Sequence, residues 1–329
     1  MKIKTAVIGL GRAGSQYDEG KIVSTPRSHV GALLQSRDFE LAAVCETSEK
    51  HRSDFFSDWT VDVPAFPQVS QLLRSGHFDV VTVATPPAEQ YEMLKEIVSC
   101  RPRVIFCEKP FCQTSKDASD ICRLAASAGV NIVVNYQRRW DERIRAVADC
   151  FKEMGRPSRF EVQYSKGLLN YGSHMLNLLE FFFGKIAEVT NAFAADDQRS
   201  LADPSISGRI RLESGLEGTL LGIDHLNYEL FDLSVYYPAA KFVLLAGGYE
   251  VKKFAVQEGV YYPGYRHLAA PEQMFEPGAI TGLLAAYDEI RRFLENPSVP
   301  LTNTGESAAR LHFTMEEMRR LAGQGGTTQ

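Results

Sequence analysis

The sequence predicts a two-domain α/β protein, and three observations lead to this fold class. A length of 329 residues is enough for two domains with separate cores. The first 137 residues alternate continuous apolar runs with helix-like stretches, a pattern typical of a doubly wound parallel sheet. After Trp140 the runs alternate apolar and polar residues, which predicts a largely antiparallel open sheet. We expect a doubly wound domain over residues 1–137 and an α+β domain over residues 138–329.

The elements of the first domain follow in order along the chain. The predicted strands are KTAVIGL, FELAAVCE, FDVVTVAT, RVIFCE and NIVVNYQ, and the predicted helices between them include SHVGALLQS, AEQYEMLKEIVS and SKDASDICRLAASAG. Strands covered by helices on both faces read as unbroken apolar runs. Such a sheet binds its ligands at the carboxyl ends of the strands.

The second domain is expected to open with a helix, DERIRAVADCFKEMG. The strands that follow are RFEVQYSKG, AEVTNAFAA, SGRIRLES, LEGTLLGID, ELFDLSVYYP and KFVLLAGG, and two helices, TGLLAAYDEIRRFLEN and GESAARLHFTMEEMRRLAG, come last. An antiparallel sheet with one exposed face commonly pairs across a symmetry axis, so we expect a homo-oligomer, a dimer or a tetramer.

Composition excludes several classes of protein. The formal net charge is −5 and no run of Lys or Arg stands out, which argues against a nucleic-acid partner. No apolar stretch approaches the roughly 20 residues that span a bilayer. The chain begins MKIKTAVIGLG, which runs directly into a strand, so we expect no signal peptide and a soluble cytoplasmic protein. The six cysteines show no metal or redox spacing and are expected to be reduced thiols.

The segment AVIGLGRAG carries a G-x-G-x-x-G motif directly after the first strand, at Gly9, Gly11 and Gly14. In this context the motif predicts a dinucleotide site in a Rossmann domain: a tight turn, a close approach to the pyrophosphate, and tight helix packing. The residues of the turn between these glycines, Leu10, Arg12 and Ala13, are included in the predicted cofactor site.

Glu46, at the end of the second strand, is placed to bind the ribose hydroxyls of the adenosine. A 2′-phosphate there would meet like charge, and no arginine directly follows, so we expect NAD rather than NADP. The interval from Gly14 to Glu46 is longer than the usual 20 or so residues. The excess falls in residues 17–29, a predicted loop that ends where Ser28 caps the next helix.

Two later strands end in residues suited to this cleft. Ala84, Thr85, Pro86 and Pro87 end one strand and turn the chain into a helix, because proline cannot continue the ladder. Glu108 and Lys109 end the next buried strand and are followed by Pro110. These strand ends are predicted to face the nicotinamide.

Together, the glycine motif, the TPP strand end, the EKP segment, NYQRRW (135–140) and LLNYGSHMLNLLEFFFG (168–184) resemble the Gfo/Idh/MocA family of oxidoreductases over nearly the whole chain. Three positions depart from the family pattern: Asn170 and Asn177 replace aspartates, and Gln90 replaces a common histidine. SKGLLNYGSH is similar to a branch associated with polysaccharide or activated-sugar metabolism.

The resemblance implies catalytic roles for Lys109 and His174. A base must take the hydroxyl proton while a hydride leaves a secondary alcohol. We expect His174 to be that base, kept neutral at the first turn of a helix capped by Ser173. Lys109 would hydrogen-bond the same hydroxyl. Gln137 is added to the cofactor site, and the expected substrate contacts are Tyr136, Arg139, Lys166, Asn170 and Tyr171.

We therefore expect an NAD-dependent dehydrogenase or reductase that interconverts a secondary alcohol and a ketone on a sugar or nucleotide-activated sugar. The alternatives are an NAD-recycling glycoside hydrolase of the same family, a non-enzymatic NAD-binding regulator, and reduction of a non-sugar carbonyl. The remaining histidines, His29 among them, do not cluster, and no metal site is expected.

Overall fold

A computed structural model describes residues 2–194, 202–226, 228–259 and 262–323. The chain divides into two compact units, which are treated one at a time below. The first contains Met1–Trp140 and Thr281–His312, and the second contains Asp141–Ile280 and Phe313–Gln329. The division falls close to the predicted boundary at residue 137, but residues 281–312 return to the first unit instead of staying in the second.

The described part of the first unit contains a six-stranded parallel sheet in the order β3-β2-β1-β4-β5-β6. This order is that of a dinucleotide-binding doubly wound fold. The strands are β1 (Ile3–Ile8), β2 (Phe39–Cys45), β3 (Ala65–Phe66), β4 (Val80–Val83), β5 (Val104–Cys107) and β6 (Asn131–Val134).

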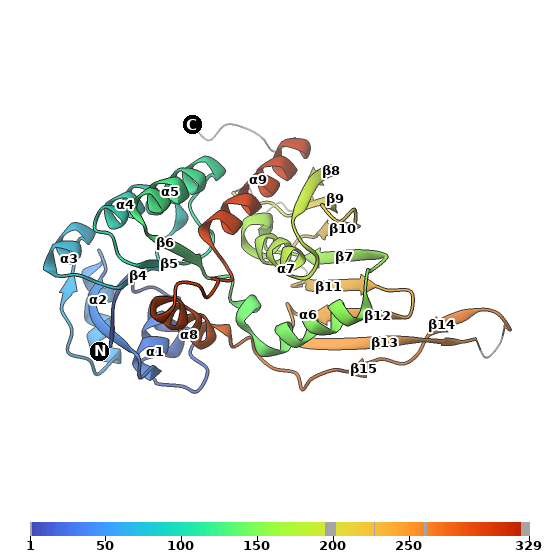
Figure 1. The fold of residues 1–329 in the computed structure, drawn as a ribbon, viewed down its shortest axis with the longest axis horizontal. Coiled ribbons are helices and arrows are strands. Elements are labelled where there is room, and N and C mark those ends of the chain that lie inside the picture. Colours follow the sequence, from blue (N-terminus) through green and yellow to red (C-terminus); the bar gives the residue numbers. More distant parts are fainter. Residues whose placement is uncertain (1, 195–201, 227, 260–261, 324–329) are drawn as a thin grey trace. The chain divides into compact units, whose positions relative to one another are not determined.

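The helices of the first unit are α1 (His29–Gln35), α2 (Glu49–Asp58), α3 (Val69–Ser75), α4 (Pro87–Ser99), α5 (Ser115–Ala128), α8 (Gly282–Glu295) and the start of α9 (Gly305–Leu321). Helices α4 and α5 lie on one side of the sheet, and α1 and α8 lie on the other (Figure 1). Helices α2 and α3 and strand β3 were not predicted from the sequence. Helix α2 is largely polar, with Phe55 as its buried residue, so it carries little periodic signal.

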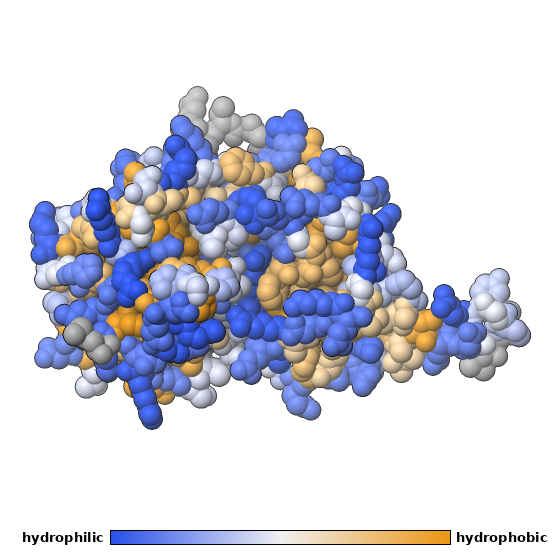
Figure 2. All heavy atoms as spheres, in the orientation of Figure 1, coloured by the Kyte–Doolittle hydropathy of each residue, from blue (hydrophilic) through white to orange (hydrophobic). Residues whose placement is uncertain are grey.

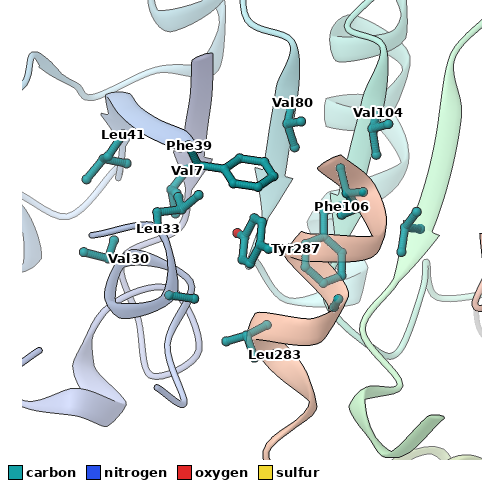
Figure 3. Packing of buried hydrophobic residues seen from close by; sticks show 14 of the residues in the cluster. Val7, Val30, Leu33, Phe39, Leu41, Val80, Val104, Phe106, Leu283 and Tyr287 are labelled. Carbon is teal, nitrogen blue, oxygen red and sulfur yellow. The ribbon is translucent and has the colours of Figure 1, made fainter. Parts of the chain in front are cut away.

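Helix α8 belongs to the first unit because its apolar face completes that core. Leu283, Tyr287 and Ile290 are each at most 2% exposed, and they pack with residues of α1, β1, β2, β4 and β5. Figure 3 shows the Tyr287 ring between Phe39 and Phe106, and both of these rings contact it edge to face. Burial of this size stabilises by about 1.5–3 kcal/mol for each large side chain.

In its described residues the second unit contains a nine-stranded sheet in the order β14-β13-β12-β11-β7-β10-β9-β8, with β15 also paired to β13. Every pair is antiparallel except β7 with β10. The strands are β7 (Arg159–Tyr164), β8 (Ile186–Ala194), β9 (Ile206–Leu212), β10 (Glu217–Gly222), β11 (Phe231–Tyr236), β12 (Ala240–Leu245), β13 (Glu250–Glu258), β14 (Arg266–Leu268) and β15 (Glu272–Gln273).

One face of this sheet is covered by α6 (Glu142–Met154) and α7 (Ser173–Phe183). Phe151 of α6 packs against the rings of Phe182, Tyr237 and Phe242. Along the strands, buried side chains alternate with partly exposed ones, as in β11 and β12, where every second residue is buried. Figure 2 shows hydrophilic residues along the outward side of α6, as expected for a helix with one buried face.

The open face carries exposed apolar side chains, including Phe193 and Leu221. Strands β13–β15, which the sequence analysis did not predict, extend the far edge of the sheet (Figure 1). Within the described residues, no helix is long and apolar enough to cross a membrane.

Candidate active site

The glycine motif forms a turn at the carboxyl end of β1 in which each glycine has a different role. Gly9 has a φ of +90°, and a Cβ there would lie 2.6 Å from the Ala84 carbonyl oxygen. A Cβ at Gly14 would overlap the Gly9 carbonyl. At Gly11, by contrast, a Cβ would meet no atom within 4 Å. Gly9 and Gly14 therefore shape the turn, while Gly11 leaves space that a ligand can enter.

The loop predicted over residues 17–29 leads from the glycine turn to α1. The backbone N–H groups of His29 and Val30 donate to the carbonyls of Ala13 and Gly14, both at 2.9 Å. The start of α1 is therefore hydrogen-bonded to the end of the glycine turn. Ser28 caps α1 as predicted, because its Oγ accepts the Gly31 N–H at 3.1 Å. The buried Asp18 carboxylate holds the loop closed through the N–H and Oγ of Ser28.

Glu46 lies beside the glycine turn, as predicted. Its Oε2 accepts the Leu10 N–H and its Oε1 accepts the Ser48 N–H, both at 2.9 Å. Burial alone would raise the pKa of Glu46, but these hydrogen bonds and the nearby His51 lower it, so the group is a carboxylate at neutral pH. Arg52, which the sequence analysis did not consider, donates to the carbonyls of Glu46 and Thr47.

Strands β1, β4, β5 and β6, which precede predicted site residues, end in the same row of the parallel sheet. Ile8, Val83 and Cys107 occupy the same row of the sheet, and Val134 continues it. The residues that follow this row continue the hydrogen-bonded ladder. The Ala84 N–H donates to the Ile8 carbonyl, the Glu108 N–H to the Val83 carbonyl, and the Asn135 N–H to the Cys107 carbonyl. The glycine turn, the TPP segment and Glu108–Lys109 therefore lie along one edge of the parallel sheet.

Pro86 and Pro87 start α4, as predicted, with Pro87 as its first residue. Gln90, at the position where the family commonly has histidine, is fully buried. Its Nε2 donates to the Thr85 carbonyl, and its Oε1 accepts the Cys112 N–H at 2.8 Å. Gln90 thus ties the TPP segment to the loop that follows Lys109.

Glu108 is held by two side chains. Its Oε1 accepts from His29 Nε2 at 3.0 Å and from Asn135 Nδ2 at 2.7 Å. His29 comes from α1, some 80 residues earlier, and the sequence analysis found no role for it. The one feature of the sequence that could have pointed to His29 is its position, as the first residue of the helix that follows the glycine turn.

The six cysteines are free thiols. Cys107 and Cys112 are buried, and burial raises the pKa of both, that of Cys112 to about 12. They are neutral thiols at neutral pH. Among the described residues no group of His, Cys, Asp and Glu is arranged to hold a metal ion.

Three predicted residues lie just after β6. Gln137 and Arg139 belong to a short 3₁₀ helix (Gln137–Trp140), and Arg139 is only 7% exposed. Tyr136 is 1% exposed, and its carbonyl accepts from Asn303 Nδ2. Two of the predicted substrate contacts, Tyr136 and Arg139, are therefore buried.

In the second unit, Lys166 and Tyr171 meet at one carboxylate. The ammonium of Lys166 pairs with Glu229 Oε1, and the Tyr171 hydroxyl donates to Oε2 at 2.9 Å. Tyr171 also stacks on Phe231. The pKa of Lys166 is raised, first by its bond to Glu229, so the pair stays ionised. Glu229, which was not predicted, therefore balances the positive charge of Lys166, one of the expected substrate contacts.

The expected cap at Ser173 is wrong. Residues Gly167–Gly172 form a π-helix that runs on into α7, and Ser173 Oγ donates to the carbonyls of Leu169 and Asn170. His174 therefore lies beyond the first turn of a longer helix, where the macrodipole has little effect. His174 is 8% exposed, and its ring lies edge to face with the Phe231 ring, with 6.0 Å between the ring centroids.

Asn170 occupies the exposed side of the π-helix. Its N–H and that of Leu169 donate to the Asp203 carboxylate at 3.0 and 2.8 Å, and Arg319 pairs with the same group. Burial raises the pKa of Asp203 despite these partners. The position of the π-helix thus depends on a carboxylate from a distant loop.

The first unit has the features that a dinucleotide needs. A Cβ at Gly11 would meet no protein atom within 4 Å, and the Glu46 carboxylate lies at the adjacent strand end, the region where a dinucleotide-binding fold places the pyrophosphate and the ribose. Gly9, Leu10, Gly11, Arg12, Ala13, Gly14, Glu46, Ala84, Thr85, Pro86, Pro87, Glu108 and Lys109 all belong to this edge of the sheet.

Comparison with known proteins agrees with this geometry. Residues 3–136 match the Gfo/Idh/MocA family, an oxidoreductase family with an NAD-binding Rossmann fold. A D-apiose dehydrogenase of Rhizobium rhizogenes is 25% identical over 169 residues, which are 46% of this chain and 48% of the relative. The chain spans about half the length of the first curated relatives it matches.

Solved structures share the fold over both units. The WlbA dehydrogenase of Bordetella pertussis, solved with NADH and UDP-GlcNAcA, has a TM-score of 0.75 at 18% identity and covers 99% of this chain and 98% of its own. The super-repressor mutant of Gal80p from Saccharomyces cerevisiae has a TM-score of 0.78 at 15% identity, with coverage of 99% and 97%. The order of the parallel sheet and the glycine turn agree with the match of residues 3–136 to the Gfo/Idh/MocA family of oxidoreductases.

Proposed function

We propose that the protein uses NAD to interconvert a secondary alcohol and a ketone on a sugar or nucleotide-activated sugar. The observation that carries this proposal is the position of Lys109. It follows β5 at the same sheet edge as the glycine turn, two strands away, with the TPP segment of β4 between them. In a doubly wound sheet this edge is where a bound dinucleotide and its substrate meet.

The expected cofactor is NAD rather than NADP. Glu46 is ionised and lies beside the turn, so a 2′-phosphate would be repelled. Arg52 lies next to Glu46 and directs its Nη1 to the backbone carbonyls of Glu46 and Thr47. When bound, NAD supplies the acceptor for the hydride. Gly9–Gly14 would hold its pyrophosphate and Ala84–Pro87 would line the path toward the nicotinamide.

The protein's own residues handle the proton. Lys109 is proposed to hydrogen-bond the reacting hydroxyl and stabilise the developing alkoxide, while the His174 imidazole takes the proton. A positioned base contributes typically about 10²- to 10⁴-fold to the rate. His174 is proposed from its place in the motif and its burial, since the helix macrodipole no longer supports it.

A sugar substrate is supported by the relatives and by the second unit. One relative is named a D-apiose dehydrogenase, and one structural neighbour was solved with a nucleotide sugar. The cluster of Lys166, Tyr171 and Glu229 offers donors and acceptors of the kind that bind sugar hydroxyls. Tyr136, Arg139 and Asn170 remain further proposed contacts, and Gln137 a proposed contact of the cofactor.

A regulator that binds NAD without catalysis is the second candidate. Asn170 and Asn177 replace the two aspartates of the family pattern, and an amide cannot supply the negative charge that a carboxylate would. Gal80p shows that this fold also occurs in a protein described as a repressor. Retention of Lys109 and His174 together favours the enzyme.

The test is a screen of free sugars, polyols and nucleotide sugars for NADH formation, with Lys109→Met as the control. The proposal expects turnover in the wild type and none in Lys109→Met, with NAD affinity unchanged. Equal turnover in both proteins would reject the assigned chemistry. NAD binding without turnover on any compound would favour the regulator, and sugar release with cofactor that stays bound would favour the recycling hydrolase.

A further inference from the structure

The side-chain amide of Gln90, in the first turn of α4, is fully buried and hydrogen-bonded at both ends. Its Nε2 donates to the Thr85 carbonyl at 2.9 Å, and its Oε1 accepts the Cys112 N–H at 2.8 Å. The Cys107 thiol lies 3.5 Å from the same Oε1. The two backbone partners fix the orientation of the amide, because an amide turned over would place its oxygen against a carbonyl and its NH₂ group against an N–H.

The two backbone partners of Gln90 belong to two segments that carry predicted site residues. Thr85 is part of the TPP segment and lies against the glycine turn, since a Cβ built at Gly9 would come within 3.1 Å of its Cγ2. Cys112 follows Lys109 by three residues. One side chain therefore holds both the segment beside the glycine turn and the segment that carries the predicted catalytic lysine.

The backbone is held on either side of Lys109. Before it, the Glu108 N–H donates to the Val83 carbonyl at 2.8 Å. After it, Cys112 is fully buried and has a φ of +61°. A non-glycine residue keeps this left-handed conformation where its surroundings enforce it, and the bond from its N–H to Gln90 is part of those surroundings. The course of the chain from Glu108 to Cys112 therefore depends on Gln90.

We propose that Gln90 is a positioning residue, which sets the spacing between the TPP segment and the backbone of Lys109. An amide does not ionise, so Gln90 acts through its hydrogen bonds and takes no part in proton transfer. For catalysis this inference rests on the proposed function, in which Lys109 contacts the reacting hydroxyl. The effect on the backbone needs no substrate.

The first measurement compares the kinetics of Gln90→Met and Leu94→Ala. Methionine is close to glutamine in size but makes neither backbone bond. Leu94, fully buried one turn further along α4, is the matched control. Gln90→Met should lower kcat on the order of 10²-fold, the loss that a misplacement of about 1 Å can cause. The KM for the sugar should stay unchanged, because Lys109 is proposed to act on charge that develops in the transition state.

The dissociation constant for NAD should change little in Gln90→Met, since Glu46 is held by the N–H groups of Leu10 and Ser48. Leu94→Ala should lower the stability of the first unit and leave kcat unchanged. Wild-type kcat in Gln90→Met overturns the inference. Should this variant fail to fold, Gln90→Asn replaces it, because its amide is one methylene too short to reach both partners. The same loss of kcat is expected there, and its absence is equally decisive.

Gln90→Glu tests the bonds themselves. A protonated carboxyl group has one donor and one acceptor, as the amide does here, whereas a carboxylate only accepts. At acid pH, where the carboxyl group is protonated, the kcat of Gln90→Glu relative to the wild type should therefore exceed that of Gln90→Met. Equal values for the two variants at every pH would show that the hydrogen bonds are not what matters.

Hydrogen exchange gives a readout without a substrate. The amides of residues 108–113, followed by mass spectrometry, should exchange faster in Gln90→Met than in the wild type, because the Cys112 N–H has lost its acceptor. Leu94→Ala should leave this segment unchanged. Equal exchange in the wild type and Gln90→Met overturns the inference, whether or not a sugar is turned over. Faster exchange in a protein without turnover on any sugar would reject the proposed function and support the role of Gln90 in holding the backbone.

Discussion

Replacing Gly9 or Gly11 of the glycine turn with alanine should damage different properties. Gly9→Ala should lower the stability of the fold, and Gly11→Ala should weaken NAD binding. Gly9→Ala places a methyl group 2.6 Å from a backbone carbonyl at a φ of +90°. A non-glycine residue forced into such a conformation costs about 1–3 kcal/mol, and the overlap with Ala84 adds to this. Gly11→Ala meets no protein atom within 4 Å. At an unstrained site this change stabilises by about 0.4–1 kcal/mol through the unfolded chain.

For NAD binding, the two variants should rank in the opposite order from their effects on stability. The space at Gly11 is where the pyrophosphate approaches the backbone, so a methyl group there should weaken NAD binding. Overfilling of a close contact costs about 1–3 kcal/mol, which corresponds to a loss of affinity of roughly 5- to 150-fold. Gly11→Ala is therefore expected to fold at least as stably as the wild type and to bind NAD poorly.

The chain offers a selective probe for the stability measurement. Its two tryptophans, Trp59 and Trp140, both lie in the first unit and are 3% and 1% exposed. Urea unfolding followed by tryptophan fluorescence thus reports the unit that contains the turn, and calorimetric titration gives the dissociation constant for NAD. Unchanged NAD affinity in Gly11→Ala would refute the placement of the pyrophosphate. Wild-type stability in Gly9→Ala would refute the steric argument.

Three further predictions follow from the described contacts. His174→Ala should remove the ionisation near neutrality from the pH profile of kcat/KM, and persistence of that limb would assign the base elsewhere. Because the pKa of Glu46 is lowered from 4.5, its carboxylate stabilises the fold above that pH, and the contribution is lost as pH falls through the lowered pKa. Glu46→Gln should therefore lower the free energy of unfolding near neutral pH and lower it less in acid. An equal loss of unfolding free energy at both pH values would contradict this. Ile290→Ala, at a fully buried position of α8, should cost about 2–5 kcal/mol in the tryptophan-detected transition, whereas the exposed Glu295→Ala should cost little.

The sequence predicts the sheet of the first unit well because its signals are local. Continuous apolar runs identify β1, β2, β4, β5 and β6, and the glycine motif and TPP segment mark where strands end. Ser28 is likewise recognisable as a helix cap from its own neighbourhood. The same local view misses α2, whose polar sequence has weak periodicity, and it misplaces the cap of α7, because a π-helix precedes that helix without a break.

Long-range partners are what sequence reasoning could not supply. Helix α8 was expected in the second domain from its position in the chain, yet its apolar face fits the core of the first. Nothing near His29 indicates that Tyr287 and Glu108 lie on either side of its ring. Glu229 and Asp203 similarly reach Lys166 and Asn170 from segments over 30 residues away, so the pairing becomes visible only in three dimensions.

The most direct test of the account is a crystal structure of the protein with NAD and a substrate or substrate analogue. We expect Lys109 Nζ and the His174 imidazole both to lie within hydrogen-bond reach, about 2.6–3.2 Å, of the reacting oxygen beside the nicotinamide. Two side chains that face different surfaces, or a dinucleotide bound away from the glycine turn, would contradict it.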